Sequence, residues 1–310
     1  MKILQLTDLH FASYPFTESD SETAELIKQM VNEEKPDLIA ITGDLISNYR
    51  LLEALPVFKG VIEFLDKLDT PIAITYGNHD SEGKYFKYLH DKFTAESANE
   101  EEFEALLTDI PDDTKEIFRN FDHFKTHSRH NIMEIVNEMT NHVEKQEVTI
   151  VDGREMYFMD IDEKTRLFFV DSGDYDYSGI GLYDAITFNQ NEWLVKHSQD
   201  SEMTGHLFIH IPLPEYAEAV AQGVAVGHQE EKICSADFNT GTWSRIKLET
   251  NIQYIYCGHD HENDFIADYH GIKLIYGRST GFNSYGKYPR GGRVIEISEN
   301  LYDSFIIEGY

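Results

Sequence analysis

Two pairs of side chains that can bind metal ions occupy matching positions in the sequence. Asp8 and His10 follow an apolar run at the N-terminus. His259 and His261 follow a second such run, Tyr254–Tyr256. In extended backbone, side chains two residues apart point to the same side, so each pair could reach one ion. One Asp-x-His triplet is weak evidence by itself, but two pairs that each follow a strand-like run indicate a metal site.

Three further polar residues stand at the ends of apolar runs. Asp44 follows Gly43, which lets the backbone turn, and its two carboxylate oxygens could bridge two cations. Asn78 offers a neutral carbonyl oxygen, and His210 ends the run Leu207–Ile209. Oxygen and nitrogen ligands without sulfur suit Mn, Fe or Zn better than copper, and the many imidazoles disfavour magnesium. We therefore expect divalent Mn, Fe or Zn.

The cysteine content excludes two other kinds of site. Cys234 and Cys257 are the only cysteines of the chain, and they do not form a CxxC pair. A disulfide framework or a thiolate zinc site is therefore not expected. Any metal must be held by nitrogen and oxygen.

The charge of the chain limits its partners. Its 310 residues include 56 acidic and 26 basic ones, which gives a formal net charge of −30. Nucleic acid is not an expected partner, because binding a polyanion needs clustered Lys and Arg. The same acidity would repel a phosphorylated substrate unless bound cations invert the local field. No apolar run reaches the roughly 18 residues of a membrane helix, and the first residues resemble a strand, not a signal. We expect a cytoplasmic protein without a membrane partner.

The first eighty residues alternate strand-like and helix-like segments. Helices are predicted for about 23–34 and 51–65, where apolar residues recur at a helical period. Alternation of this kind implies a parallel sheet, which places ligands at the carboxyl ends of its strands. A further helix is predicted for 190–197. The predicted strands, which are short apolar or β-branched runs, are 4–6, 38–41, 72–75, 157–161, 167–170, 207–209, 254–256, 273–276, 294–297 and 304–307.

The segment from about residue 84 to 145 breaks this pattern. It is acidic and helix-prone, it contains no strand-like run, and it follows the third predicted strand. We interpret it as a helical insertion or cap beside the site, within a single domain that spans residues 1–310.

The ordered motifs resemble those of the calcineurin-type metallophosphoesterases. A closer resemblance is to their purple acid phosphatase-like branch. It covers most of the chain, whereas about 84–127 is extra sequence relative to that branch. The family motifs are Asp8-x-His10, Gly43-Asp44, Gly77-Asn78-His79-Asp80, the lone His210 and Gly258-His259-Asp260-His261. The residues that indicate the branch are 167–175, 210–215, 258–265 and 285–287, with Arg290 and Arg293.

The resemblance implies an α/β fold in which two mixed β-sheets form a sandwich flanked by helices. It also implies two divalent metal ions and a hydroxide, activated by both, that attacks the phosphorus. His79 would protonate the leaving group, and Asp80 would hold the His79 imidazole in the correct tautomer. The alternative is that either residue only orients its neighbours in the site. The first metal would bind Asp8, His10, Asp44 and His261, and the second would bind Asp44, Asn78, His210 and His259.

One residue departs from true purple acid phosphatases. The colour of those enzymes comes from a tyrosinate on ferric iron, three residues after the bridging aspartate. This chain has Ser47 at that position, and it has His10 where those enzymes have a residue that does not bind metal. We therefore expect a colourless metal pair that need not include ferric iron.

Three residues are weaker candidates for substrate contacts. Arg278 follows the predicted strand 273–276, Lys84 follows the Asn-His-Asp motif, and His228 lies in a glycine-containing loop. Surface salt bridges are the alternative interpretation of Arg278 and Lys84, and a solvated or core position is the alternative for His228 and the other histidines outside the motifs.

The leading functional hypothesis is hydrolysis of phosphomonoesters on small molecules or phosphoproteins. A phosphodiesterase acting on cyclic nucleotides or other diesters is the first alternative, because the metal ligands do not separate the two. A non-catalytic metal-binding scaffold is the second. The oligomeric state cannot be predicted from these residues.

Overall fold

The structure is a computed structural model. It describes residues 1–47, 51, 53–108, 110, 112–123, 125, 127–199, 202–298 and 301–309. Position 52 of the predicted helix 51–65 and positions 109, 111, 124 and 126 of the predicted insertion lie outside the described residues.

The first sheet has five strands in the order β13-β12-β1-β2-β3. Strands β1, β2 and β3 run parallel to one another, whereas β12 pairs antiparallel with both β1 and β13. β1, β2 and β3 are mostly apolar and almost fully buried, as expected for parallel strands covered on both faces. The strand bounds are β1 (Lys2–Leu6), β2 (Leu38–Thr42), β3 (Ile72–Thr75), β12 (Gly291–Ser298) and β13 (Leu301–Glu308).

The second sheet has eight strands in the order β4-β5-β6-β7-β9-β11-β10-β8. Its centre, β6-β7-β9-β11, is parallel, and the outer strands pair antiparallel. The bounds are β4 (Gln146–Val151), β5 (Arg154–Asp162), β6 (Thr165–Val170), β7 (Thr204–Phe208), β8 (Ala225–Val226), β9 (Ile252–Cys257), β10 (Ile266–Tyr269) and β11 (Ile272–Tyr276).

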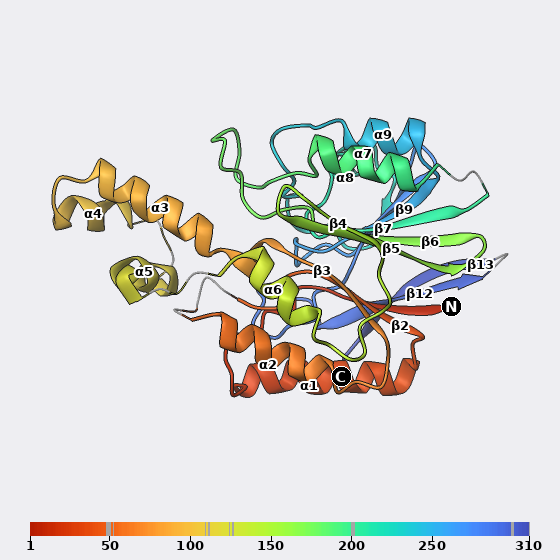
Figure 1. Cartoon of the computed structure of the whole chain (residues 1–310), viewed down its shortest axis with the longest axis horizontal. Helices are drawn as coiled ribbons and strands as arrows, with labels where there is room; N and C mark the ends of the chain where they lie inside the picture. Colours follow the sequence, from red (N-terminus) through yellow and green to blue (C-terminus); the bar gives the residue numbers. More distant parts are fainter. Residues whose placement is uncertain are drawn as a thin grey trace.

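The two sheets pack face to face over an aromatic and aliphatic core. Phe169, Phe208 and Tyr256 stack in succession across the second sheet and meet Ile3 and Ile295 of the first. Figure 1 shows the sheets as two inner layers with helices outside both. The predicted sandwich of two mixed sheets is confirmed.

Three helices cover the outer face of each sheet. α1 (Glu18–Glu34), α2 (Leu55–Leu65) and α6 (Arg129–Val136) pack on the first sheet. α7 (Phe188–His197), α8 (Glu215–Ala221) and α9 (Thr242–Glu249) pack on the second. α1 begins earlier than predicted because Thr17 and Asp20 form a capping box. α2 begins later than predicted, at Leu55, and has a proline in its first turn.

The predicted insertion divides into two parts. Figure 1 shows α3, α4 and α5 standing to one side of the sandwich, where they share a small core around Phe86, Ile117 and Phe118. α6, by contrast, packs against α2 in the main core. The independent helical cluster therefore consists of the three helices before α6. The remaining bounds are η2 (Asn78–Ser81), α3 (Gly83–Glu96), α4 (Glu100–Leu106), α5 (Asp112–Arg119) and η3 (Phe121–His123).

Three strands and two α-helices of the structure were not predicted from the sequence. These are strands β4, β8 and β10 and helices α8 and α9. β4 lies at a sheet edge, and its Val148 and Ile150 side chains are exposed, so its sequence lacks a buried apolar run. Among the described residues, no helix is both long and apolar enough to cross a membrane.

A buried histidine makes the sandwich sensitive to acid. His206 on β7 is 1% exposed, stacks on Tyr254, and has its Nδ1 atom 2.9 Å from the Tyr256 hydroxyl. Burial lowers the pKa of His206 to about 3, whereas a histidine of the unfolded chain titrates near pH 6.5. Between pH 6.5 and pH 3 the unfolded chain binds a proton at His206 that the folded protein does not bind. The unfolding free energy therefore carries no penalty from His206 above pH 6.5, and it decreases as the pH falls from 6.5 towards 3.

We predict that His206→Phe removes this acid sensitivity. The unfolding free energy of wild type minus that of the variant should fall by about 2 kcal/mol between pH 8 and pH 5. Urea unfolding of metal-free protein at both pH values measures it, and His130→Phe, at an exposed imidazole, is the control. An unchanged difference would contradict the buried, neutral state of His206.

Candidate metal centre

The predicted ligands meet where the parallel strands of both sheets end. Asp8, Asp44 and Asn78 follow β1, β2 and β3 of the first sheet. His210 follows β7, and His259 and His261 follow β9 of the second. None of the seven ligand residues, which include His10, is more than 7% exposed. Strand topology therefore gathers side chains that are up to 253 residues apart into one buried cluster.

The first group of ligand atoms comprises Asp8, His10 and His261, all within 4.8 Å of one another. The Nε2 atoms of His10 and His261 are 3.1 Å apart, and His261 Nε2 lies 3.3 Å from Asp8 Oδ1. Ser47 Oγ lies 3.1 Å from His10 Nδ1, which turns the Nε2 atom of His10 towards the group. Two imidazole nitrogens and a carboxylate oxygen that converge in this way can coordinate a cation.

The second group comprises Asp44, His210 and His259. His210 Nε2 lies 3.1 Å from both Asp44 Oδ2 and Asn78 Oδ1. His259 Nε2 is buried and has no hydrogen-bond partner among the described residues. A buried polar atom without a partner is costly, and a metal ion would satisfy it. The donor set therefore fits a divalent cation in this group as well.

Asp44 lies between the two groups. Its Oδ2 atom is 3.1 Å from His210 Nε2 and 3.7 Å from His10 Nε2, while its Oδ1 atom accepts the His79 backbone N–H at 2.8 Å. Gly43 has φ +91°, and a Cβ there would lie 2.5 Å from Gly77 N. Only glycine allows β2 and β3 to end so close together, which places Asp44 where a bridging ligand must be.

The backbone at the ligands is not extended. Asp8, His10, Asp44 and His259 have φ values of 54°, 49°, 53° and 80°, in the left-handed region. The residues do converge, but the reason given from the sequence, side chains two apart on an extended strand, is wrong. Each left-handed residue of this kind costs about 1–3 kcal/mol, and such strain clusters at functional sites.

The electrostatics of the cluster suit cations. Burial would raise the pKa of Asp8, but His261 outweighs it and lowers that pKa to about 2. Burial lowers the pKa of His259 to about 3, so this imidazole is neutral and able to coordinate. For His210, burial is outweighed by Asp44, which raises the pKa to about 9. Without metal, a protonated His210 supplies positive charge that a bound cation would replace.

His79 has a different partner from the one predicted. Its Nδ1 atom lies 2.7 Å from Glu82 Oε1, and Glu82 is 1% exposed. The prediction that Asp80 orients His79 is therefore wrong. Burial lowers the pKa of His79, but Glu82 and then Asp44 outweigh it and raise this pKa to about 9. The His79 side chain is 24% exposed and its ring lies 5.2 Å from that of His10, at the open side of the cluster.

Asp80 instead holds the strand-end loops together. Its two oxygens accept backbone N–H groups of Asp44, Leu45 and Gly77 at 2.7–3.0 Å, with a longer bond from Ile46. It is fully buried. Its carboxylate thus fixes the loop that carries the bridging aspartate to the loop that carries Asn78 and His79.

Two of the weaker substrate candidates lie in a different environment from the one predicted. Arg278 is 3% exposed and forms ion pairs with Asp264 and Glu308. His228 Nδ1 lies 3.0 Å from the same Asp264. Both side chains are held by Asp264, which makes them parts of a structural ion-pair network, so their predicted contact with substrate is not supported.

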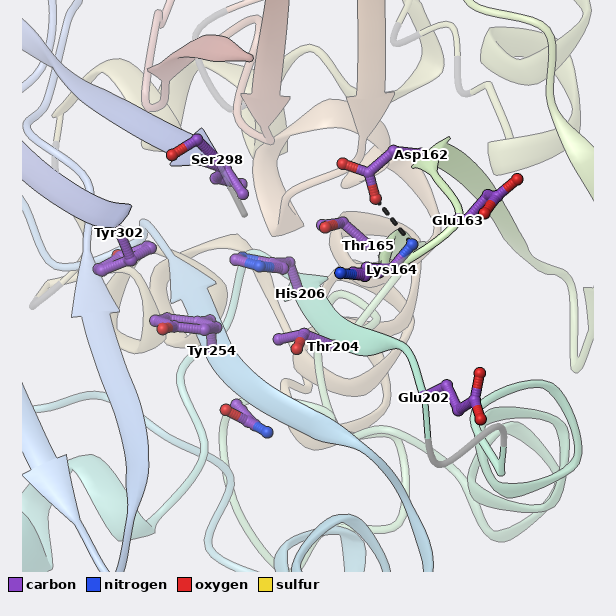
Figure 2. A pocket seen from close by; sticks show the side chains of 12 residues that line it. Asp162, Glu163, Lys164, Thr165, Glu202, Thr204, His206, Tyr254, Ser298 and Tyr302 are labelled. Carbon is purple, nitrogen blue, oxygen red and sulfur yellow. Dashed lines mark hydrogen bonds between the residues drawn. The ribbon is translucent and has the colours of Figure 1, made fainter. Parts of the chain in front are cut away.

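Lys84 and two of the cavities lie outside the cluster of predicted ligands. Lys84 is exposed, with its Nζ atom 4.1 Å from the centre of the Tyr177 ring, and it lines a cavity of about 600 Å³ with Arg129. Another cavity, of about 660 Å³, is lined by His206, Tyr254 and Tyr302 (Figure 2). It lies at the amino-terminal ends of β7 and β9, away from the ends that bear the predicted ligands.

Sequence reasoning missed several residues of the site. Glu82 could have been found from its place three residues after His79, which is one turn of a 3₁₀ helix. Tyr175 joins Glu82 to Asn78: it donates to Glu82 Oε1 at 2.5 Å and accepts from Asn78 Nδ2 at 3.0 Å. It lies 97 residues from Asn78, and no sequence signal pointed to this contact.

We predict that Asp80 is needed for stability. Asp80→Ala leaves three or four buried N–H groups without an acceptor, and should lower the unfolding free energy by about 3 kcal/mol. Urea unfolding with a chelator present measures this without a metal contribution. Asp91→Ala, at an exposed carboxylate, is the control. A loss below about 1 kcal/mol would contradict the loop-fixing role.

Comparison with known proteins agrees with this geometry. The model of the calcineurin-like phosphoesterase family matches residues 1–263. A protein named probable inactive purple acid phosphatase 14, from Arabidopsis thaliana, is 27% identical over 328 aligned residues, which cover 95% of this chain and 74% of the relative. Probable inactive purple acid phosphatase 29 of the same plant is 25% identical, covering 96% of this chain and 77% of its own.

Solved structures share the fold. A dimetal phosphatase from Danio rerio superposes with a TM-score of 0.62 at 12% identity, covering 99% of this chain and 98% of its own. Purple acid phosphatase PPD1 from yellow lupin seeds has a TM-score of 0.50 at 12% identity, covering 99% of this chain and 53% of its own. The predicted family resemblance is confirmed, and the chain belongs to the calcineurin-like phosphoesterase family.

Proposed function

We propose that this protein hydrolyses phosphomonoesters with the help of two divalent metal ions. The observation that carries the proposal is the pair of buried ligand groups with Asp44 between them and His79 at their open side. Mn, Fe or Zn suit these oxygen and imidazole donors. The name of the Danio rerio neighbour, a dimetal phosphatase, is consistent with such a centre.

The chain would hold the metals and the phosphoryl group in a fixed geometry. Asp8, His10 and His261 would bind one cation, and Asn78, His210 and His259 the other, with Asp44 shared. When bound, the metal pair would supply Lewis-acid polarisation of the phosphoryl group and activation of the attacking water. Asp80 fixes the loop that carries Asp44 to the loop that carries Asn78, so these ligands would be aligned before substrate arrives.

His79 would protonate the leaving oxygen. Glu82 holds the Nδ1 atom of His79, so the proton would pass from Nε2. Glu82 is held in turn by the Tyr175 hydroxyl, which also accepts a hydrogen bond from Asn78. An ion pair and two hydrogen bonds thus link the proposed proton donor to a proposed metal ligand, and fix their relative position.

Two alternatives differ in what they require of the same site. A phosphodiesterase would show a large preference for an aryl phosphodiester over the matching monoester. A non-catalytic metal-binding scaffold would bind metal without turnover, and both plant relatives are named probable inactive purple acid phosphatases. Against the scaffold stands His79, held by Glu82 at the open side of the cluster, because metal binding alone does not need a proton donor there.

The substrates proposed are phosphorylated small molecules or phosphoproteins in the cytoplasm, not nucleic acid or membranes. A formal charge of −30 would repel polyanions, whereas a single phosphoryl group could be drawn in by the local field of two cations.

We predict that turnover of a phosphomonoester by the Mn²⁺-loaded protein depends on His79 and Glu82 as a unit. His79→Asn should lower kcat by roughly 10²–10⁴-fold, because it removes the proton donor. Glu82→Gln should lower kcat by about tenfold alone but by less than about twofold in the His79→Asn background, because coupled residues are not additive.

His130→Asn, at an exposed position of α6, is the matched control and should keep wild-type turnover. If the Mn²⁺-loaded protein shows no phosphomonoester turnover, or if its turnover is unaffected by His79→Asn, the proposed enzymatic function is refuted. If Glu82→Gln lowers kcat by the same factor in the wild type and in the His79→Asn variant, Glu82 does not act through His79.

A further inference from the structure

Two tyrosine rings contact the outer imidazoles of the metal centre, one on each ligand group. The Tyr183 ring meets His259 edge to face, with ring centres 4.4 Å apart. The Tyr285 ring stacks on His261 with ring centres 4.0 Å apart and planes inclined by 24°. Tyr285 is 56% exposed and Tyr183 is half-buried, so both rings remain open to a ligand. The proposed hydrolysis uses neither ring.

Both rings are held in place. The Tyr285 hydroxyl donates to Glu231 Oε2 at 2.8 Å, and Glu231 Oε1 accepts the Glu262 backbone N–H at 2.5 Å. Tyr183 pairs with Tyr175 through an isolated β-bridge, and their rings stack with centres 5.8 Å apart. A ring that is already fixed loses little entropy when a ligand binds, so these contacts would favour binding.

The aromatic surface continues from Tyr183 onto the helical insertion. Tyr175 stacks on Tyr85 of α3 with ring centres 4.0 Å apart and planes inclined by 11°. Tyr177 lies against Tyr85 on the same side, with ring centres 6.3 Å apart. We call Tyr85, Tyr175, Tyr177 and Tyr183 the tyrosine wall. Through it, the insertion contributes to the surroundings of the metal centre.

We infer that the substrate is an aryl phosphomonoester, in which an aromatic ring is joined directly to the ester oxygen, as in a phosphotyrosine side chain. The inference rests on the proposed function. With the phosphoryl group at the metal centre, we expect the first group beyond the ester oxygen to meet one of the two rings, Tyr183 or Tyr285, because each contacts an imidazole of one ligand group. Flat rings gain from stacked and edge-to-face contacts that saturated groups lack.

A nucleotide fits this arrangement less well. Its phosphate is joined to a saturated ribose, so the base would lie one sugar further out than the rings that contact His259 and His261. Alkyl phosphates would gain hydrophobic contact with the tyrosines but no ring–ring interaction. Because the tyrosine rings directly contact the metal-binding histidines, they favour an aryl ester over a nucleotide or an alkyl ester.

Inhibition by two phosphonates of equal carbon number tests the inference. Phenylphosphonate carries a flat ring and cyclohexylphosphonate a puckered one, and neither can be hydrolysed. With Mn²⁺-loaded full-length protein, phenylphosphonate should inhibit with an inhibition constant about tenfold lower than that of cyclohexylphosphonate. Tyr183→Leu and Tyr285→Leu should each reduce this ratio to about 3 or less, whereas Tyr183→Phe and Tyr285→Phe, which keep the ring, should preserve it.

The control is Tyr14→Leu. Tyr14 is exposed and its ring packs on Phe16, so this variant should leave the ratio of the two inhibition constants unchanged. Equal inhibition constants in the wild type, or a ratio that the leucine variants do not change, would overturn the inference. If alkyl phosphomonoesters are still hydrolysed in that case, the proposed function stands. If no phosphomonoester is hydrolysed and neither phosphonate binds, both fail.

Discussion

Two carboxylates buried among imidazoles are the constraint on which the site depends. Asp8 and Asp44 are each 1% exposed, and a buried ionised carboxylate costs several kcal/mol unless positive charge lies beside it. In the metal-free chain, part of that charge comes from His210 and His79, whose pKa values are raised to about 9. The positions of the other ligands follow from the same need: each adds a donor where a cation would compensate the two aspartates.

The sandwich makes this concentration of polar groups possible. Parallel strands of two sheets end on the same side, so backbone loops from both reach one point. This convergence costs conformational free energy, because the backbone is left-handed at four ligands. Asp80 offsets part of that cost by accepting hydrogen bonds from backbone N–H groups of two loops. A rigid apolar core under both sheets keeps these loops from relaxing.

The sequence could predict what depends on residue type and strand order, and not what depends on local turns or distant contacts. Asp8, His10 and His261 converge as expected, yet Asp8 and His10 do so through positive φ values that a strand pattern cannot reveal. The family resemblance assigned Asp80 to His79, but the 3₁₀ turn brings Glu82 there instead. Arg278 and His228 are drawn to Asp264, a contact that strand-end position alone did not reveal.

The central claim is that these side chains hold two cations that share Asp44. Crystals grown with Mn²⁺, measured at the manganese absorption edge, test it most directly. We predict two anomalous peaks roughly 3.5–4 Å apart, one among Asp8, His10 and His261 and the other beside His210 and His259, each in contact with a different oxygen of Asp44 or sharing one. A single peak, or manganese bound only elsewhere, would contradict the shared two-metal centre.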